Sequence, residues 1–231
     1  MKKIILNLLV LSTAILAASF NEGDYAYNKG NYQDASKLWQ KKCNSGDIKS
    51  CNNLGVLYEN AQGVKKDYKK ASQLYKQACD QNKSDACYNL AILYQNGKGV
   101  KQNFAKTSEL FTKACDSGDA YACNNLGVLY KNGKGVKRNF TKASQLFNKA
   151  CASNIASGCY NLGVLYENAQ GLNQDYKKAK QLYQKACDSG DAHSCYNLGA
   201  LYKNGKGVIK DEKKANQLYE KACKDGGCSR K

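Results

Sequence analysis

Proline is absent from this 231-residue chain, and histidine and tryptophan each occur once. Because no proline can interrupt a helix, long segments can stay helical between glycine-containing turns. With His193 as the only imidazole, zinc sites and Ser-His-Asp triads lack their usual ligands and base. The sequence contains a repeat, described below, and at the position of His193 its other copies carry unrelated residues. This variation predicts that His193 lies on the surface. We therefore expect no metal and no cofactor.

Long apolar runs are also scarce, and the only one lies at the start. Met1-Lys2-Lys3 precedes the apolar segment 4–18, and Ala17-Ala18-Ser19 supplies small residues before a cut near Ser19–Phe20. This pattern is typical of a secretory signal peptide over residues 1–19. The run is short for a membrane anchor and contains Asn7. We expect a secreted protein, periplasmic or extracellular, without a membrane span after signal removal.

Cysteine, by contrast, is abundant and strictly periodic. Six cysteines recur every 36 residues, and each of the first five has a partner eight residues later. In an oxidising compartment an even number of regularly spaced cysteines predicts disulfides rather than metal ligands. We predict one bridge per repeat: Cys43–Cys51, Cys79–Cys87, Cys115–Cys123, Cys151–Cys159, Cys187–Cys195 and Cys223–Cys228.

Leucine and tyrosine residues recur with the same 36-residue period, and Leu54, Leu90 and Leu126 belong to one such series. A fixed period of this length indicates a solenoid whose units bury their apolar faces against their neighbours. We expect a capping half-repeat over 20–43, repeats over 44–228 and a tail over 229–231. The expected first helices cover about 48–60, 84–96, 120–132, 156–168 and 192–204. The expected second helices cover about 67–79, 103–115, 139–151, 175–187 and 211–223.

Local signals support these bounds. Each first helix ends at an asparagine followed by glycine or alanine, residues that tolerate a left-handed helix end. Each second helix begins at an Asx residue suited to an N-cap: Asp67, Asn103, Asn139, Asp175 and Asp211. The first cysteine of each pair then ends one helix and the second begins the next, so the bridge closes a helix–helix corner.

The motifs Asn-Leu-Gly-Val-Leu-Tyr, Gly-x-Gly-Val and Tyr-x-Lys-Ala-Cys are similar to the Sel1-like repeat, a relative of the tetratricopeptide repeat. With the cysteine spacing, the chain resembles the Helicobacter cysteine-rich proteins over residues 20–228. The resemblance implies an all-α fold, namely a right-handed αα superhelix. It implies that the protein is exported and that it binds penicillin. It also implies a β-lactamase label, meaning weak hydrolysis of penicillin-type substrates, and roles in host interaction.

The residues themselves do not carry that enzymatic chemistry. Serine β-lactamases need Ser-x-x-Lys together with Ser-Asp-Asn and Lys-Thr-Gly. No serine here has lysine three positions later, and Lys106-Thr107-Ser108 is not Lys-Thr-Gly. Catalytic residues therefore stay unassigned, and weak β-lactam hydrolysis is the alternative implied by resemblance alone.

Charge and glycine loops admit two further hypotheses. The formal charge of +17 suits contact with an anionic surface, but the lysines are spread over every repeat, which favours a solvated face and no specific nucleic acid. The Gly-Lys-Gly loops at 97–99, 133–135 and 205–207 could cradle a phosphate. A simple helix–helix turn fits them better, because two repeats have alanine at the first glycine.

A polar ladder is the candidate binding site. Helix one of each repeat carries an asparagine two residues after its second cysteine, and tyrosine or asparagine beside it. In related superhelices this helix lines the concave surface, where amides can pair with a peptide backbone; alternatively, they tie neighbouring helices together. The expected partners are a peptide, a peptidoglycan fragment or a host or envelope protein, and also β-lactams as mimics. The candidate residues are Asn53, Asn89, Asn125, Asn161, Asn197, Tyr88, Tyr160 and Tyr196.

Overall fold

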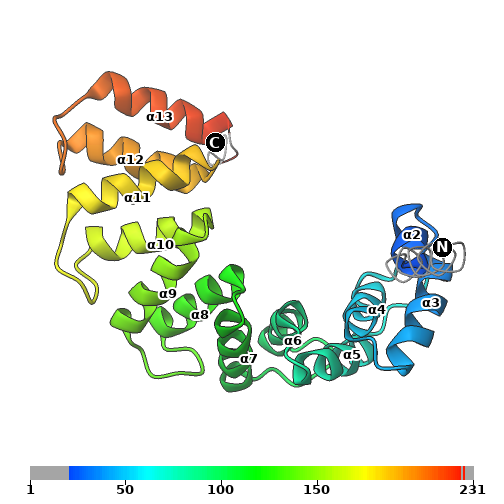
Figure 1. Ribbon diagram of the computed structural model, residues 1–231. Coiled ribbons are helices and arrows are strands. Elements are labelled where there is room, and N and C mark those ends of the chain that lie inside the picture. The colour runs from blue at the N-terminus through cyan, green and yellow to red at the C-terminus, as the bar shows by residue number, and fades with distance from the viewer. Residues whose placement is uncertain (1–20, 225, 227–231) are drawn as a thin grey trace, which may run out of the picture. The chain divides into compact units, whose positions relative to one another are not determined.

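The computed structural model describes residues 21–224 and residue 226, and within them it contains twelve α-helices and no β-strand. Two N-terminal helices, α2 (Glu22–Asn28) and α3 (Tyr32–Asn44), precede five helix pairs (Figure 1). The first helices are α4 (Ile48–Asn60), α6 (Ser84–Asn96), α8 (Ala120–Asn132), α10 (Ala156–Glu167) and α12 (Ala192–Asn204). The second helices are α5 (Tyr68–Asp80), α7 (Phe104–Asp116), α9 (Phe140–Ala152), α11 (Tyr176–Asp188) and α13 (Glu212–Lys224). The predicted all-α solenoid is confirmed.

The helices form two compact units. The first comprises the described residues through Ala86 together with Lys98–Lys101, and therefore contains α2 to α5. The second comprises Cys87–Gly97 and the described residues from Gln102 onward, with α7 to α13. In the first unit α3 packs on α4 and α4 on α5. In the second, each helix from α7 to α13 packs on the next along the chain.

Each repeat builds its core from leucines and one aromatic ring. In the α8–α9 pair, Leu126, Leu129 and Phe147 are buried. Gly127 faces this ring, and a Cβ placed there would lie 2.6 Å from the Phe147 Cε1 atom. The glycine therefore lets helix α8 approach the ring closely. The same pairing recurs between Gly55 and Tyr75, Gly163 and Tyr183, and Gly199 and Tyr219.

The predicted N-caps are confirmed. The side chain of each Asx residue accepts a hydrogen bond from the backbone N–H three residues later, at 2.8–2.9 Å. Because an N-cap lies just outside its helix, α5 begins at Tyr68 rather than at Asp67. At the other end, α10 stops at Glu167, and the Asn168 side chain donates to the Val164 carbonyl at 2.9 Å.

The second glycine of each interhelical loop has a packing role. Gly99, Gly135, Gly171 and Gly207 have positive φ values of 66–71°. A Cβ at Gly135 would lie 2.2 Å from the backbone carbonyl carbon and oxygen of Phe104. Only glycine allows the loop to contact the start of the previous repeat's second helix at this distance.

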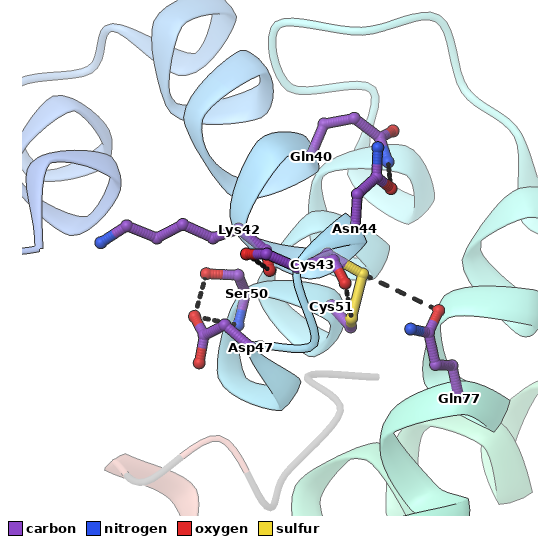
Figure 2. Close-up of a disulfide and its surroundings, with 9 residues drawn as sticks. Gln40, Lys42, Cys43, Asn44, Asp47, Ser50, Cys51 and Gln77 are labelled. Carbon is purple, nitrogen blue, oxygen red and sulfur yellow. Dashed lines mark hydrogen bonds between the residues drawn. A yellow bond between two sulfur atoms is a disulfide. The ribbon is translucent and has the colours of Figure 1, made fainter.

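Disulfides close the corners between consecutive repeats, as predicted. Cys43–Cys51, Cys115–Cys123, Cys151–Cys159 and Cys187–Cys195 have Cα–Cα distances of 4.5–4.7 Å. Figure 2 shows the first, where Asp47 caps the next helix through the Ser50 amide and the Gln77 side chain lies 3.8 Å from Cys43 Sγ. Cys79, Cys87 and Cys223 are also disulfide-bonded, and the described residues contain no free cysteine.

Some sequence predictions fall beyond the part of the chain that the structure describes. These are the signal peptide over 1–19, the tail over 229–231 and Cys228, the predicted partner of Cys223. Among the described helices, none combines the length and the apolar character needed to cross a bilayer.

Candidate functional site

The middle of the polar ladder joins neighbouring repeats. The Asn161 side chain donates to the Asn124 side-chain oxygen at 3.0 Å. Asn124 in turn donates to Asn125 at 3.4 Å, and Asn125 donates to the Tyr88 hydroxyl at 3.3 Å. This chain of bonds crosses three consecutive repeats, from α6 through α8 to α10. Asn124 and Asn161 are buried, so these amides tie first helices together.

The ladder tyrosines pack on the aromatic residue of their own repeat. Ring centroids lie 5.6 Å apart for Tyr88 and Phe111, 6.1 Å for Tyr160 and Tyr183, and 5.0 Å for Tyr196 and Tyr219. Tyr88 and Tyr160 are half-buried, whereas Tyr196 in the last repeat is 53% exposed. Among these three rings, only Tyr196 presents most of its surface to solvent.

Asn197 belongs to a partly buried polar cluster around the buried Tyr183. The Tyr183 hydroxyl donates to Glu167 at 2.7 Å. Burial raises the pKa of Tyr183 well above its usual range, the Glu167 hydrogen bond and charge add to this, and a hydrogen bond from Asn197 opposes it. Tyr75 and Glu59 form the same pair in the first unit at 2.8 Å. A neutral tyrosine that donates to a carboxylate fixes the two helices of one repeat.

Asn53 and Asn89 differ from the central amides. Asn89 is half-buried and also has an interaction partner. Asn53 is half-buried, and no hydrogen bond to its side chain is found among the described residues. Asn53 is therefore the ladder amide best placed to bind a ligand, and it lines a cavity.

This cavity, which we call the cap cavity, has a volume of about 290 Å³ and lies between α2, α3 and α4. Its polar side is an ion pair of 2.6 Å between Lys49 Nζ and Asp24 Oδ2. The Trp39 indole N–H donates to the other Asp24 oxygen at 3.2 Å. Tyr27 packs on Trp39 with ring centroids 5.4 Å apart. The lining residues are Asp24, Tyr27, Asn28, Trp39, Lys49, Asn53 and Val56.

The cap cavity offers distinct chemistry on each side. The Lys49 side chain remains 59% exposed, so its ammonium has donors left for an anion besides Asp24. Asn53 supplies an amide donor and acceptor. Trp39, Tyr27 and Val56 form an apolar and aromatic floor. The combination suits a short peptide segment with a carboxylate.

The Gly-Lys-Gly loops do not present free lysines. Lys98 lies 5.3 Å from the ring centroid of Tyr68, Lys134 lies 5.6 Å from that of Phe104, and Lys206 lies 5.4 Å from that of Tyr176. Each lysine therefore covers an aromatic ring of the previous repeat through a cation–π contact. These loops are turns that connect the two helices of one repeat, in agreement with the simpler sequence interpretation.

The single histidine, the possible metal ligands and the cysteines can each be examined in the described part of the chain. His193 is exposed, and its ring centroid lies 6.1 Å from that of Tyr160. The described residues contain no group of three or more His, Cys, Asp and Glu side chains that could hold a metal ion. The cysteines that they contain are disulfide-bonded and cannot act as nucleophiles.

The repeat pattern matches a known family. The sequence model of the Sel1 repeat matches five consecutive segments, which are residues 48–83, 84–119, 120–155, 156–191 and 192–227. The chain belongs to the Sel1 repeat family. The five matches cover the helix pairs from α4–α5 to α12–α13, and the cap cavity lies where the first matched repeat meets α2 and α3.

Solved Sel1 structures share this fold. A Sel1 repeat protein from Oxalobacter formigenes is 33% identical, with a TM-score of 0.81 over 89% of this chain and 84% of that one. The protein c5321, described as a protective antigen of uropathogenic Escherichia coli with an SLR fold, is 28% identical with a TM-score of 0.81. That match covers 85% of this Sel1 protein but 42% of c5321.

A shorter match connects the chain to a named Helicobacter protein. "Putative beta-lactamase HcpE" from Helicobacter pylori strain J99 is 44% identical over 45 residues. This segment is 20% of the present chain and 13% of HcpE. The match therefore spans little more than one repeat, and the chain covers a small part of that relative's length.

Sequence reasoning identified Asn53 but missed its neighbours in the cap cavity. Asp24, Tyr27 and Trp39 belong to the shortened N-terminal unit, where the 36-residue period is broken and the positions align less directly with those of the other repeats. One signal was present. The only tryptophan of the chain replaces the tyrosine or phenylalanine of the other repeats, at Trp39.

Proposed function

We propose that this Sel1 repeat protein binds short peptide segments, including the carboxyl-terminal end of the peptidoglycan stem peptide. It would also bind penicillins, which mimic that end. The observation that carries the proposal is the cap cavity, in which one unbonded amide, one ammonium and two aromatic rings converge. Solenoids of this class use extended surfaces for binding, and the four disulfides with assigned partners support an oxidising extracytoplasmic environment.

The size of the cap cavity limits the ligand. Ligand pockets usually measure about 300–1,000 Å³, and the cap cavity at about 290 Å³ lies at the lower end. It fits a chain terminus better than a whole extended peptide. A terminal carboxylate would bind Lys49, the adjacent peptide group would bind Asn53, and small methyl side chains would rest on Trp39 and Tyr27.

We expect Trp39 fluorescence to report this binding directly, because Trp39 is the only tryptophan of the chain and lines the cap cavity. Titration with an acetylated peptide ending in Lys-D-Ala-D-Ala should change the emission. Asn53→Ala and Lys49→Gln should each weaken binding by about tenfold, since a hydrogen bond contributes about 0.5–1.5 kcal/mol and more when one group is charged. Calorimetry gives the affinities.

The matched control is Asn125→Ala. Asn125 is the equivalent ladder position, but its amide is occupied by Tyr88 in the second unit. The variant should bind the peptide like the wild type. If Asn125→Ala lowers the affinity and Asn53→Ala does not, the result would contradict a binding site in the cap cavity. It would favour a binding site on the polar ladder instead.

Weak β-lactam hydrolysis is the second candidate, and the HcpE match favours it. The sequence contains no Ser-x-x-Lys motif, and the single imidazole of His193 is exposed. We expect turnover of a chromogenic cephalosporin far below about 10 per second, an ordinary enzyme rate. His193→Ala should leave it unchanged. Turnover at that rate, abolished by one substitution, would contradict the binding function as the main activity.

A further inference from the structure

Two tripeptides of the chain have the pattern Asn-x-Ser/Thr. They are Asn82-Lys83-Ser84 and Asn139-Phe140-Thr141. In an exported protein this pattern marks an acceptor for N-linked oligosaccharide, provided that the asparagine lies in an accessible surface loop. The two tripeptides are equivalent as sequence motifs, so the structure must distinguish them.

Asn139 is already used by the fold. It is the N-cap of α9, and its side-chain oxygen accepts a hydrogen bond from the Lys142 N–H at 2.9 Å. Its backbone N–H also donates to the Tyr130 carbonyl at 2.9 Å. The side chain is partly buried. Glycosylation would require the Asn139 side chain to enter the active site of a transferase. This would break its hydrogen bond with the Lys142 N–H and leave the first turn of α9 uncapped.

Asn82 has none of these constraints on its side chain. It lies in the three-residue connection between α5 and α6, and it is exposed. Its φ of +64° places it in the left-handed region, within the turn between the two helices. The backbone N–H donates to the Cys79 carbonyl at 2.9 Å. No partner for the Asn82 side chain is found among the residues that the structure describes.

The charges around the two asparagines differ, since Asn82 lies between Asp80 and Lys83. Asp80 stands two residues before Asn82, and its side chain is 57% exposed although it pairs with Lys76. Lys137 and Arg138 precede Asn139. A transferring enzyme that binds its donor's diphosphate with cationic groups would repel the Lys137–Arg138 segment more than the segment around Asp80. Charge and accessibility therefore favour the same asparagine.

We propose that Asn82 is a site of N-linked glycosylation and that Asn139 is not. The donor would be an oligosaccharide linked to a lipid diphosphate, and an oligosaccharyltransferase would catalyse the step. The Asn82 Nδ2 atom forms a bond to the anomeric carbon of the first sugar. The bond from that carbon to the diphosphate oxygen breaks, and the lipid diphosphate leaves with the electron pair. Nδ2 loses one proton to a base of the transferase.

The test uses the full chain with its N-terminal segment. It is expressed in bacteria that contain an oligosaccharyltransferase, its lipid-linked donor and a reporter glycoprotein. Mass spectrometry of proteolytic peptides then gives the occupancy of each asparagine. We expect the Asn82 peptide to carry the mass of the glycan and the Asn139 peptide to be unmodified.

Two matched substitutions remove the motifs without changing either asparagine. Ser84→Ala should abolish the mass increase, and Thr141→Ala should leave it unchanged. Ser84→Thr should retain it, which separates loss of the hydroxyl from loss of folding. A glycan on Asn139, or an unmodified Asn82 in cells that glycosylate the reporter, would overturn the proposal. Neither result depends on peptide binding in the cap cavity.

Discussion

Substituting Gly135 by alanine is expected to lower the free energy of unfolding by about 3 kcal/mol. A Cβ at this position would lie 2.2 Å from the backbone carbonyl of Phe104, which cannot move like a flexible side chain. Overpacking of this kind typically costs about 1–3 kcal/mol. The left-handed φ of +71° adds about 1–2 kcal/mol for an L residue. Denaturant unfolding followed by circular dichroism measures the loss.

The control is Gly133→Ala in the same loop. Gly133 also has a positive φ, +68°, but the nearest atoms to a Cβ there would be the Arg138 Cβ at 3.2 Å and the Arg138 backbone nitrogen at 3.5 Å. The chain itself has alanine at the equivalent positions, Ala61 and Ala169. Gly133→Ala should therefore cost mainly the conformational part, about 1–2 kcal/mol, and less than Gly135→Ala. Equal losses for the two variants would show that backbone conformation, and not contact with Phe104, sets the requirement for glycine.

Replacing Cys115 and Cys123 together by alanine is expected to destabilise the oxidised protein by about 2.5 kcal/mol. The bridge closes a loop of about nine residues, and the chain-entropy model assigns this amount to such a loop. Both cysteine residues are buried, at 5% and 4% exposure, so the bridge is also part of the interface between repeats. Because neighbouring repeats stabilise one another, the loss should appear first as unfolding around α7 and α8.

Reduction provides the control for the cysteine variant. In a strong thiol reductant the wild type also loses this bridge, so the difference between the two proteins should shrink towards zero. Both should stay helical, since the leucine and aromatic contacts of each repeat remain. Wild type and variant with equal stability in the oxidised state would contradict a stabilising role for the Cys115–Cys123 bridge.

Periodicity made most of the fold predictable from the sequence. Each structural position occurs five times, so a leucine, an Asx residue or a glycine at a constant interval reveals its role without long-range information. The N-caps at Asp67 and its equivalents, and the pairing of Cys43 with Cys51, follow from short-range geometry. Such interactions depend on residues less than ten positions apart, and these positions are fixed once the helices form.

The polar ladder shows where this reasoning ends. Asn53 and Asn125 occupy the same repeat position, and their sequence surroundings are nearly identical. Only the tertiary structure distinguishes them: the Tyr88 hydroxyl accepts from Asn125, whereas Asn53 faces the cap cavity. The partner of Asn125 and most residues around Asn53 come from other helices, and their identity depends on how the helices stack.

The sequence by itself therefore determined the repeat, the helix pairs, their caps and the cysteine corners, because these arise from local and periodic interactions. The tertiary structure alone decided which polar residues are free. It placed Lys98 over Tyr68, held Asn139 as a cap while leaving Asn82 exposed, and joined Asp24, Trp39, Lys49 and Asn53 around one cavity. Availability for binding or modification depends on burial and hydrogen-bond occupancy, which belong to the packed chain and not to any single segment.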